Sequence, residues 1–418
     1  MKRVHFLLAA LIALSTFGIF PATAQEEDVT FRFLNLLDDT VDVYRNESVS
    51  FFGIQTEAIS AQRTITAGDH SFAIYAQNGD PAQSDALATF TFAAESGQEA
   101  VIIASEYDGQ ISLTSHMFDL SLVRVNRTRI ELVNLSNASP SVTITAQNND
   151  VLFEDLPAGE AASADVPSGN YQLNLTDNAG EIISTNTLNA SPGELETVVL
   201  FGANRMQTYS LTRQLDFMGL LRFVHAGRVA PPVDVYVNGE LTFPTISYTG
   251  WGDYVPLEPG DYTIEIYEAG TNTLLLSDNL QLGITGPITA VIMGERNPRL
   301  TFNQDNHQLI GADSARVRFI NAALDLLALE VAVEGEDSLV SALDYVLASR
   351  NRDIPSGART LNFGESGSTT FVTLPNFTFQ PNHSYTFVAL GNGLIDGSIQ
   401  VLALDWNWRE GTAPIPHQ

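Results

Sequence analysis

The chain has 418 residues, of which 49 are Asp or Glu, 20 are Lys or Arg and none is Cys, and its formal net charge is −29. This acidic excess argues against nucleic acid and anionic membrane surfaces as partners, because both require clustered cations on the protein. The lack of cysteine excludes disulfides and thiol nucleophiles, so stability has to come from hydrophobic cores. A strongly acidic surface also keeps a protein soluble and resistant to aggregation.

The N-terminus, residues 1–24, is typical of a secretory signal peptide. Lys2 and Arg3 precede an apolar run over residues 6–19, and Ala22 to Ala24 form a small-residue cleavage site. Cleavage leaves a chain without Lys, with a net charge of about −31. No later segment approaches roughly 18 consecutive apolar residues, so we expect no transmembrane segment after signal cleavage. We expect the mature protein to be secreted or associated with the cell envelope.

Beyond the leader, one pattern recurs four times with a period of about 95 residues. Each copy opens with a short apolar strand that ends in a polar residue: Asn35, Asn134, His225 or Asn321. A turn glycine follows 33–36 residues later, and a further apolar strand ends 68–70 residues after the same landmark. Short apolar runs bounded by Gly, Pro, Asn and Asp predict packed sheets. We therefore predict an all-β fold of four tandem immunoglobulin-like β-sandwich repeats of about 95 residues, with domains at 25–120, 121–214, 215–312 and 313–418.

The segments between the copies predict rigid joints. A flexible tether avoids large apolar residues, whereas these segments contain Phe118, Leu120, Leu122, Leu215, Phe217, Met218, Leu309 and Ile310. We expect these residues to pack between neighbouring domains in a semi-rigid rod of about 120–150 Å with its sandwiches end to end. Helical periodicity is weak throughout, and residues 337–349 form the one plausible short helix.

Comparison of the copies suggests a recurrent ion pair. The first strand carries an Arg and the second an acid in three of the copies, as Arg32 with Asp42, Arg222 with Asp234, and Arg318 with Glu330. The second copy has Glu131 and Thr143 instead, so both members change together. We predict a cross-strand ion pair between the first two strands of a copy. The alternative is that Arg and acid merely occupy solvated faces.

Catalytic motifs are absent from the sequence. There is no G-x-S-x-G elbow, no S-x-x-K and no metal-binding histidine spacing. His225 occupies a position that is Asn in the other copies, so a structural hydrogen bond at a strand end is favoured over catalysis or metal binding. Two carboxylates suited to glycoside hydrolysis remain an alternative. Calcium could bind hard oxygen ligands such as those of Asp38, Asp39 and Asp42, or of Asp253, Glu258 and Asp261, although Asx turns are the simpler interpretation.

Aromatic residues offer the best indication of a ligand. Tyr248, Trp251 and Tyr254 cluster in one loop and strand of the third copy, and Trp406 and Trp408 lie at i, i+2 near the C-terminus, where they share one face of a strand. Exposed rings of this kind stack on sugar rings or peptides. The interpretation favoured over ligand binding is that the rings belong to a core or to a domain cap.

The third copy resembles a known bacterial family. It reads LRFVHAGRVAPPVDVYVNGE over residues 221–240 and continues with Pro259-Gly260-Asp261-Tyr262. This is similar to the domain-of-unknown-function family 4397 (DUF4397), whose repeats open with a "VHA…P.VDVYV.G" segment and continue to a "PAG.Y" turn. The other copies match less well. The resemblance implies an exported, tandemly repeated β-sandwich of the bacterial cell envelope or of secreted proteins, and it implies no catalytic residues.

Together these observations predict an exported, non-enzymatic protein that acts as a cell-envelope or extracellular scaffold or adhesion module. Its partner is expected to be a cell-envelope component or an extracellular protein or polysaccharide, and no cofactor is expected apart from a potential Ca²⁺. The first alternative is a carbohydrate-binding module that uses the Trp251 loop or the face of Trp406 and Trp408. The second alternative is a carboxylate-dependent hydrolase.

Overall fold

The computed structural model describes residues 28–107, 109–177, 180–228, 231–283, 286–294, 297–324, 326–368, 371–391 and 399–407. The predicted signal peptide, residues 1–24, and Trp408 lie outside these ranges. Within them the chain forms strands and turns and contains no helix, which confirms the all-β prediction.

The first two copies each form two sheets. In the first copy one sheet has the order β4-β1-β8-β9, with β5 also paired to β1, and the other has the order β3-β2-β6-β7. In the second copy the orders are β14-β11-β17-β18 and β13-β12-β15-β16. The strands are β1 (Val29–Asn35), β2 (Val41–Arg45), β3 (Ser48–Ile54), β4 (Ala58–Ile59), β5 (Arg63–Ile65), β6 (Gly68–Ala76), β7 (Ala88–Ala94), β8 (Glu99–Tyr107), β9 (Gln110–Met117), β10 (Val123–Arg124), β11 (Arg127–Ser136), β12 (Ser141–Ala146), β13 (Val151–Pro157), β14 (Ala161–Pro167), β15 (Gly169–Thr176), β16 (Ile182–Ala190), β17 (Glu194–Gly202) and β18 (Arg205–Gln214).

The third and fourth copies repeat this arrangement. Their sheets have the orders β22-β19-β25-β26 and β21-β20-β23-β24, then β30-β27-β33-β34 and β29-β28-β31-β32. The strands are β19 (Phe217–His225), β20 (Val233–Val237), β21 (Glu240–Ile246), β22 (Trp251–Leu257), β23 (Gly260–Glu268), β24 (Leu274–Leu282), β25 (Ile288–Met293), β26 (Arg299–Gln304), β27 (Ser314–Asn321), β28 (Ala328–Val333), β29 (Ser338–Asp344), β30 (Arg352–Pro355), β31 (Gly357–Glu365), β32 (Phe371–Phe379), β33 (His383–Leu390) and β34 (Gln400–Asn407).

Each copy is a sandwich whose first strand pairs in parallel with its second-last strand. The pairs are β1 with β8, β11 with β17, β19 with β25 and β27 with β33. This parallel pair distinguishes the strand order from that of a constant-type immunoglobulin domain, in which seven strands form two antiparallel sheets. We call the sheet with the parallel pair the inner sheet and its companion the outer sheet. A hydrophobic cluster fills the space between the two sheets of each copy.

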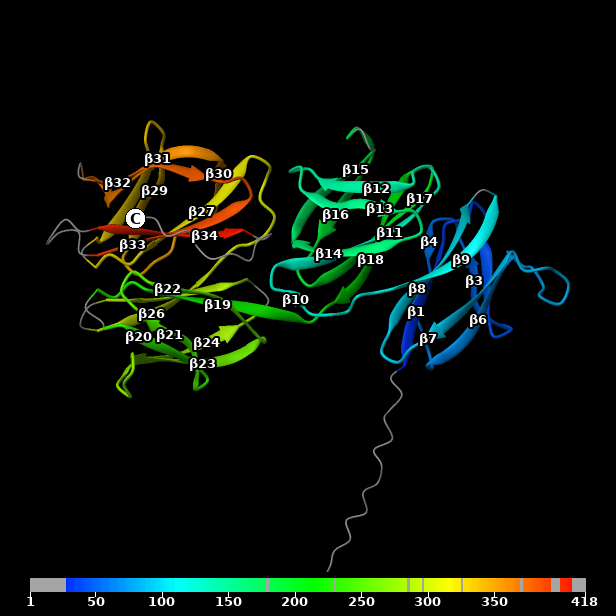
Figure 1. Ribbon diagram of the computed structural model, residues 1–418, viewed down its shortest axis with the longest axis horizontal. Helices are drawn as coiled ribbons and strands as arrows, with labels where there is room; N and C mark the ends of the chain where they lie inside the picture. Colours follow the sequence, from blue (N-terminus) through cyan, green and yellow to red (C-terminus); the bar gives the residue numbers. More distant parts are fainter. Residues whose placement is uncertain are drawn as a thin grey trace, which may run out of the picture.

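The copies associate in pairs through their inner sheets (Figure 1). In the first pair, Leu34 and Ile103 of the first copy join Val133 and Val199 of the second in one buried cluster. Equivalent residues join the third and fourth copies, namely Val224, Val291, Ile320 and Val388. The inner strands read as continuous apolar runs because both of their faces are buried.

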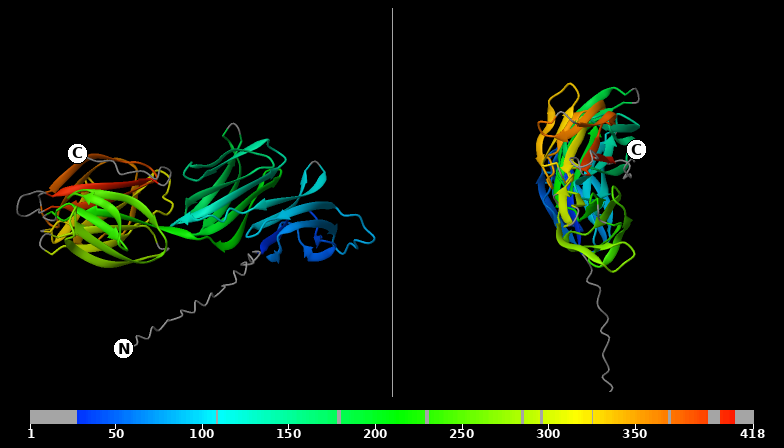
Figure 2. Two further views of the ribbon diagram at one scale, coloured as in Figure 1. Left: turned by 60° about the horizontal axis from the view of Figure 1, so that its bottom comes forward. Right: turned by 90° about the vertical axis from the view of Figure 1, so that its left-hand side faces the viewer.

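This pairing corrects the predicted end-to-end rod. The third and fourth sandwiches lie side by side, the second lies next to them and the first lies at the far end (Figures 1 and 2). The outer sheets are left on the outside of each pair.

The joints are packed, as predicted, with one exception. Phe118, Leu215 and Ile310 are buried, whereas Leu122 is 55% exposed. The short strand β10, which lies between the first and second copies, pairs in parallel with the start of β19. This pairing fixes the first connection to the third copy.

Two further predictions are wrong. The predicted ion pair between the first and second strands does not form, because these strands lie in different sheets of the sandwich. The carboxylate of Asp42 instead accepts hydrogen bonds from the backbone N–H groups of Gly53 and Asn78, both at 2.7 Å. The predicted helix over residues 337–349 is the edge strand β29 followed by a turn. A helix over so short a segment would have few turns and little stability of its own. Pairing with β28 is therefore favoured.

The structural role predicted for the strand-end polar residues is confirmed. The side-chain amide of Asn321 donates to the carbonyls of Leu326 at 2.8 Å and Leu343 at 2.9 Å, while its oxygen accepts from the N–H of Ala323 at 3.2 Å. His225 makes the equivalent contacts, with its Nε2 at 3.0 Å from the carbonyl of Pro231. Burial lowers the pKa of His225, so its ring stays neutral.

We predict that Asn321→Ala destabilises the fourth copy by about 1–3 kcal/mol, because two buried carbonyls lose their donor. Urea unfolding followed by tryptophan fluorescence measures the change. Asn272→Ala, at an exposed turn of the third copy, is the matched control and should leave the midpoint unchanged. Equal midpoints for the two variants would contradict the role assigned to Asn321.

Candidate functional site

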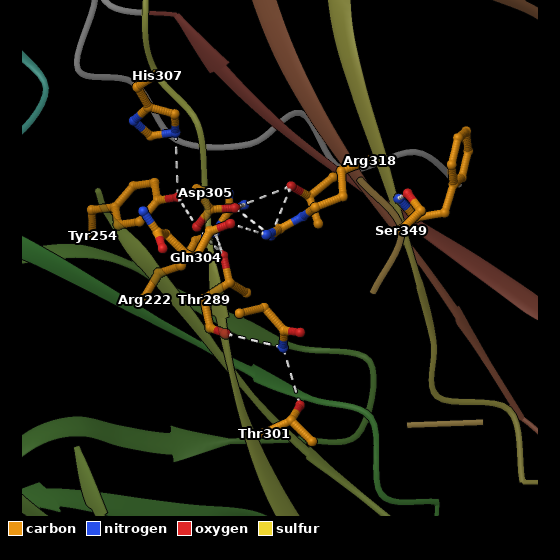
Figure 3. Close-up of polar contacts among 12 residues, drawn as sticks. Arg222, Tyr254, Thr289, Thr301, Gln304, Asp305, His307, Arg318 and Ser349 are labelled. Carbon is orange, nitrogen blue, oxygen red and sulfur yellow. Dashed lines mark hydrogen bonds and ion pairs between the residues drawn. The ribbon is translucent and has the colours of Figure 1, made fainter. Parts of the chain in front are cut away.

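The main concentration of buried charge lies where the third and fourth copies meet. Asp305 follows β26 directly and opens the connection to β27, and its side chain is 3% exposed. Arg222 of β19 and Arg318 of β27, which occupy equivalent positions in their copies, both form ion pairs with Asp305 (Figure 3). One carboxylate therefore holds the two inner sheets together.

Hydroxyl groups complete the shell around this carboxylate. Tyr254 donates to Oδ2 of Asp305 at 2.6 Å and Thr289 donates to the same atom at 2.5 Å. Burial by itself raises the pKa of Asp305, but the guanidinium groups of Arg318 and Arg222 outweigh it and lower the pKa to about 2. Burial raises the pKa of Tyr254 well above its ordinary value, so its hydroxyl remains a donor.

An aromatic stack extends the cluster to the second copy. His307 lies parallel to the indole of Trp406, with ring centroids 3.6 Å apart, and its ring meets Tyr254 edge-on. The guanidinium carbon of Arg127, on β11 of the second copy, lies 5.4 Å from the centroid of the Trp406 ring. Burial lowers the pKa of His307 well below its usual range and that of Arg127 to about 10, so at neutral pH the imidazole is uncharged and the guanidinium is charged. Side chains from three copies thus meet at one junction.

Backbone contacts tighten the same junction. The N–H of Leu309, in the connection between the third and fourth copies, donates to the carbonyl of Ser168 in the second copy at 2.9 Å. A Cβ placed on the neighbouring Gly169 would lie 2.7 Å from the Cβ of Leu309, so this close approach requires glycine. The amide of Asn148 also donates to Asn382 across the second and fourth copies at 3.2 Å.

A second recurrent element clamps the connection within each pair. Arg129 of β11 binds Asp165 through two nitrogens, at 2.7 and 3.0 Å, and donates to the carbonyls of Asp119 and Ser121. Arg316 of β27 binds Asp353 in the same way and donates to carbonyls of its own connection. The even copies alone carry this arginine at the first-strand position, since the odd copies have Thr30 and Leu220 there.

The arrangement of this junction suits the joining of copies. The carboxylate of Asp305 is engaged by two guanidinium groups and two hydroxyl donors, whereas Nδ1 of the uncharged His307 has no hydrogen-bond partner in the described part of the chain. Among the described residues no three His, Asp or Glu side chains come together as a metal site, so the carboxylates suggested for calcium are not gathered into one. In addition, the same residues include no helix long and apolar enough to cross a membrane.

The structure places the predicted ligand-binding aromatics at the joints. Trp406 is 8% exposed and packed in the junction described above, and Tyr254 contributes its hydroxyl to the Asp305 cluster. Tyr248 and Trp251 are half-buried and pack against the apolar cluster between the third and fourth copies. The rings are therefore not brought together on one exposed face, and Trp408 lies outside the described residues. Ligand binding by Tyr248, Trp251, Tyr254, Trp406 and Trp408 stays a prediction.

Sequence reasoning missed the residues that form the junction. Asp305, Arg127, Arg129 and Arg316 were not singled out. Arg129 and Arg316 had a signal in the sequence, because they occupy the same position of the first strand in the two even copies. The odd copies have Thr30 and Leu220 at that position. Asp305, the partner of Arg318, lies in the connection between the third and fourth copies. No comparable connection joins the second and third copies.

These features define the class of the protein: an all-β chain of repeated sandwiches joined by buried contacts. A family model, "Domain of unknown function (DUF4397)", matches residues 29–145 and 219–332, which together make up more than half of the chain. The chain therefore belongs to the DUF4397 family. The first matched segment begins at the start of β1 and the second within β19, and each ends within the second strand of the even copy that follows.

Comparison with solved structures finds weak similarity. One match, "Alpha-glucan binding by a streptococcal virulence factor", is 12% identical, covers 43% of this chain and 95% of the other, and has a TM-score of 0.16. The structure of a streptococcal ancillary pilin is 12% identical over 65% of this chain and 100% of the other, with a TM-score of 0.14. A Bacteroides ovatus glucan-utilization protein, SGBP-B, is 10% identical over 88% of this chain and 97% of its own, with a TM-score of 0.13. At these scores the similarities carry no inference about function. Comparison with curated proteins gives no match.

Asp305→Ala should destabilise the joined third and fourth copies by about 3–5 kcal/mol, because it leaves two guanidinium groups buried without a counter-charge. Thermal or urea unfolding of the mature chain measures the effect. Asp278→Ala, on the exposed face of β24, is the control and should change stability little. A loss for Asp305→Ala no larger than that of the control would contradict the role of the cluster.

The stability of the junction should also depend on acid. The folded-state pKa of Asp305 is lowered from 3.8 to about 2, so its ionised form stabilises the fold fully above about pH 4 and this contribution of roughly 2 kcal/mol disappears as the pH falls to about 2. The free energy of unfolding of the wild type should therefore fall more steeply with decreasing pH over this range. In Asp305→Asn, which cannot titrate there, that part of the pH dependence should be missing.

Proposed function

We propose that this protein is an exported, non-enzymatic scaffold or adhesion module of the cell envelope or the extracellular space. The observation that supports the proposal is the junction of Asp305, His307, Trp406 and Arg127, which locks three copies into one body. The inner sheets are used for assembly, and the outer sheets remain available to partners. A rigid body with several free sheet faces suits presentation and attachment better than turnover.

The second alternative, a carboxylate-dependent hydrolase, finds limited support: of the three cavities described, one of about 170 Å³ between the first two copies is lined by two carboxylates, Asp38 and Glu106, with Arg205 beside them. A cavity of about 560 Å³ beside Arg124 and Arg127 has Asp165 as its only carboxylate, and a cavity of about 650 Å³ on the first copy has only Glu47. Glycoside hydrolysis of the usual kind requires two carboxylates across one cleft. The junction adds no candidate, because the carboxylate of Asp305 is sealed.

The proposal is tested by co-sedimentation of residues 25–418 with isolated envelopes of the producing cell and with insoluble polysaccharides, with and without calcium. Saturable retention without any hydrolysis products is expected. Release of reducing sugar from any of the polysaccharides would overturn the non-enzymatic part of the proposal, and the absence of retention on every surface would overturn the attachment part.

The rigidity on which the proposal depends is measurable by spin-label distances. Because the chain lacks Cys, Thr187→Cys on β16 and Thr378→Cys on β32 place one label on each of the second and fourth copies. A single narrow distance distribution is expected. Arg127→Ala should broaden it by removing the cation over Trp406, whereas Arg124→Ala, at an exposed neighbour on β10, should not. A broad distribution in the unaltered background would contradict the single rigid body.

A further inference from the structure

The outer sheet of the first copy carries an open cavity of about 650 Å³ that no joint uses. Tyr44 of β2 and Tyr75 of β6 line it, and Ala73 lies between them on the sheet because it pairs directly with Tyr44. Pro81 and Ala82, from the connection between β6 and β7, close one side. The volume falls within the range of about 300–1,000 Å³ that is usual for small-molecule sites.

The two tyrosine rings form a fixed aromatic corner. Their centroids are 5.2 Å apart and their planes meet at 77°, so one ring presents its face and the other its edge. Both side chains are half-buried. Rings held in this way offer a rigid apolar surface at little conformational cost, and their hydroxyl groups remain free to form hydrogen bonds.

The third copy has the same corner with a different neighbouring residue. Tyr236 and Tyr267 are 5.3 Å apart at 76°. Glu265 occupies the position of Ala73, since it pairs with Tyr236, and its carboxylate accepts a hydrogen bond from Tyr267 at 3.3 Å. The connection that overhangs the cavity is also longer in the first copy, at residues 77–87, than in the third, at residues 269–273. A small residue and a long connection together create the space.

The lining indicates the chemistry of the occupant. It includes the hydroxyl-bearing Ser71, Thr89 and Thr91 and one carboxylate, Glu47, but no Arg, Lys or His. A phosphate, sulfate or uronate group would meet negative charge without a compensating cation. The strands β2 and β6 are paired on both sides within their sheet, so an extended peptide lying across this face would find no main-chain partner on them. Aromatic faces surrounded by hydroxyl groups suit an uncharged sugar, which is apolar on its ring faces and polar at its edge.

We propose that the cavity bounded by Tyr44, Ala73, Tyr75 and the connection 77–87 binds a segment of a neutral glycan. The inference gives the proposed attachment function a ligand class, and it rests on that function only for its biological setting. The tyrosine corner of the third copy is not part of the site, because Glu265 fills it.

Affinity gel electrophoresis of residues 25–418 tests the proposal, with soluble starch, mixed-linkage β-glucan and galactomannan as neutral probes and polygalacturonate as the anionic control. Slower migration with at least one neutral polymer and none with polygalacturonate is expected. Ala73→Glu and Tyr75→Ala should each weaken that binding about tenfold or more. Tyr267→Ala, the matched change in the third copy, should leave it unchanged.

Ala73→Glu is a variant whose folding can be anticipated, because the third copy carries Glu at the same register. An unchanged unfolding midpoint would show that lost binding reflects a filled cavity. Binding that survives both Ala73→Glu and Tyr75→Ala, or no binding to any neutral polymer, would overturn the inference. If envelope co-sedimentation persists in either case, the attachment function stands without this site; if glycan binding is intact but envelopes retain nothing, attachment to envelopes fails and the glycan site stands.

Discussion

The arrangement of this chain depends on burial of a second face of each inner sheet. A sandwich needs only one buried face per sheet, yet Ile103, Val199, Val291 and Val388 occupy equivalent positions on the opposite face, and all four are buried. Each pair of copies thereby becomes four sheets deep. Separating the members of a pair would expose this apolar surface, which costs about 25 cal/mol per Å². The pair, rather than the single sandwich, is therefore the unit of stability.

The two pairs of copies bury groups of opposite charge at the same position of the inner sheet. At one equivalent position the second copy has Glu131, bound by His116 at 2.6 Å, and the fourth copy has Arg318, bound by Asp305. A buried charged group requires a polar or charged partner, so each substitution at this position needs a compensating change in the last strand or the connection that precedes the copy. Arg129 and Arg316, which clamp that connection, recur without change of type. The two segments matched by the family model start at odd copies and cross into even ones, which agrees with duplication of a two-copy unit.

The sequence alone was sufficient to predict the features that depend on local pattern. Strand periodicity, the strand-end role of Asn321 and His225 and the packing of apolar joints all follow from short-range pattern, because each depends on a residue and its immediate register. The pairing of copies and the sharing of Asp305 between two arginines depend on contacts between distant segments, which alternation along a strand does not reveal. The same limit explains why the sequence left both a core role and a ligand-binding role open for Trp406: a ring on an edge strand is free or covered according to what packs over it, here His307.

The inner sheets join the copies, and the proposed ligand recognition uses an outer sheet. An inner-sheet residue contacts a neighbouring copy on one face and its own core on the other, so a change there has two packing costs. An outer-sheet residue such as Ala73 or Glu265 contacts solvent on one face and changes without disturbing a joint. Copies that share a core can therefore differ in the outer sheet, where the first copy has Ala73 beside a long connection and the third has Glu265 beside a short one. The proposed binding thus depends on the outer sheet of a single copy, whereas the rigidity of the chain depends on the inner sheets of a pair.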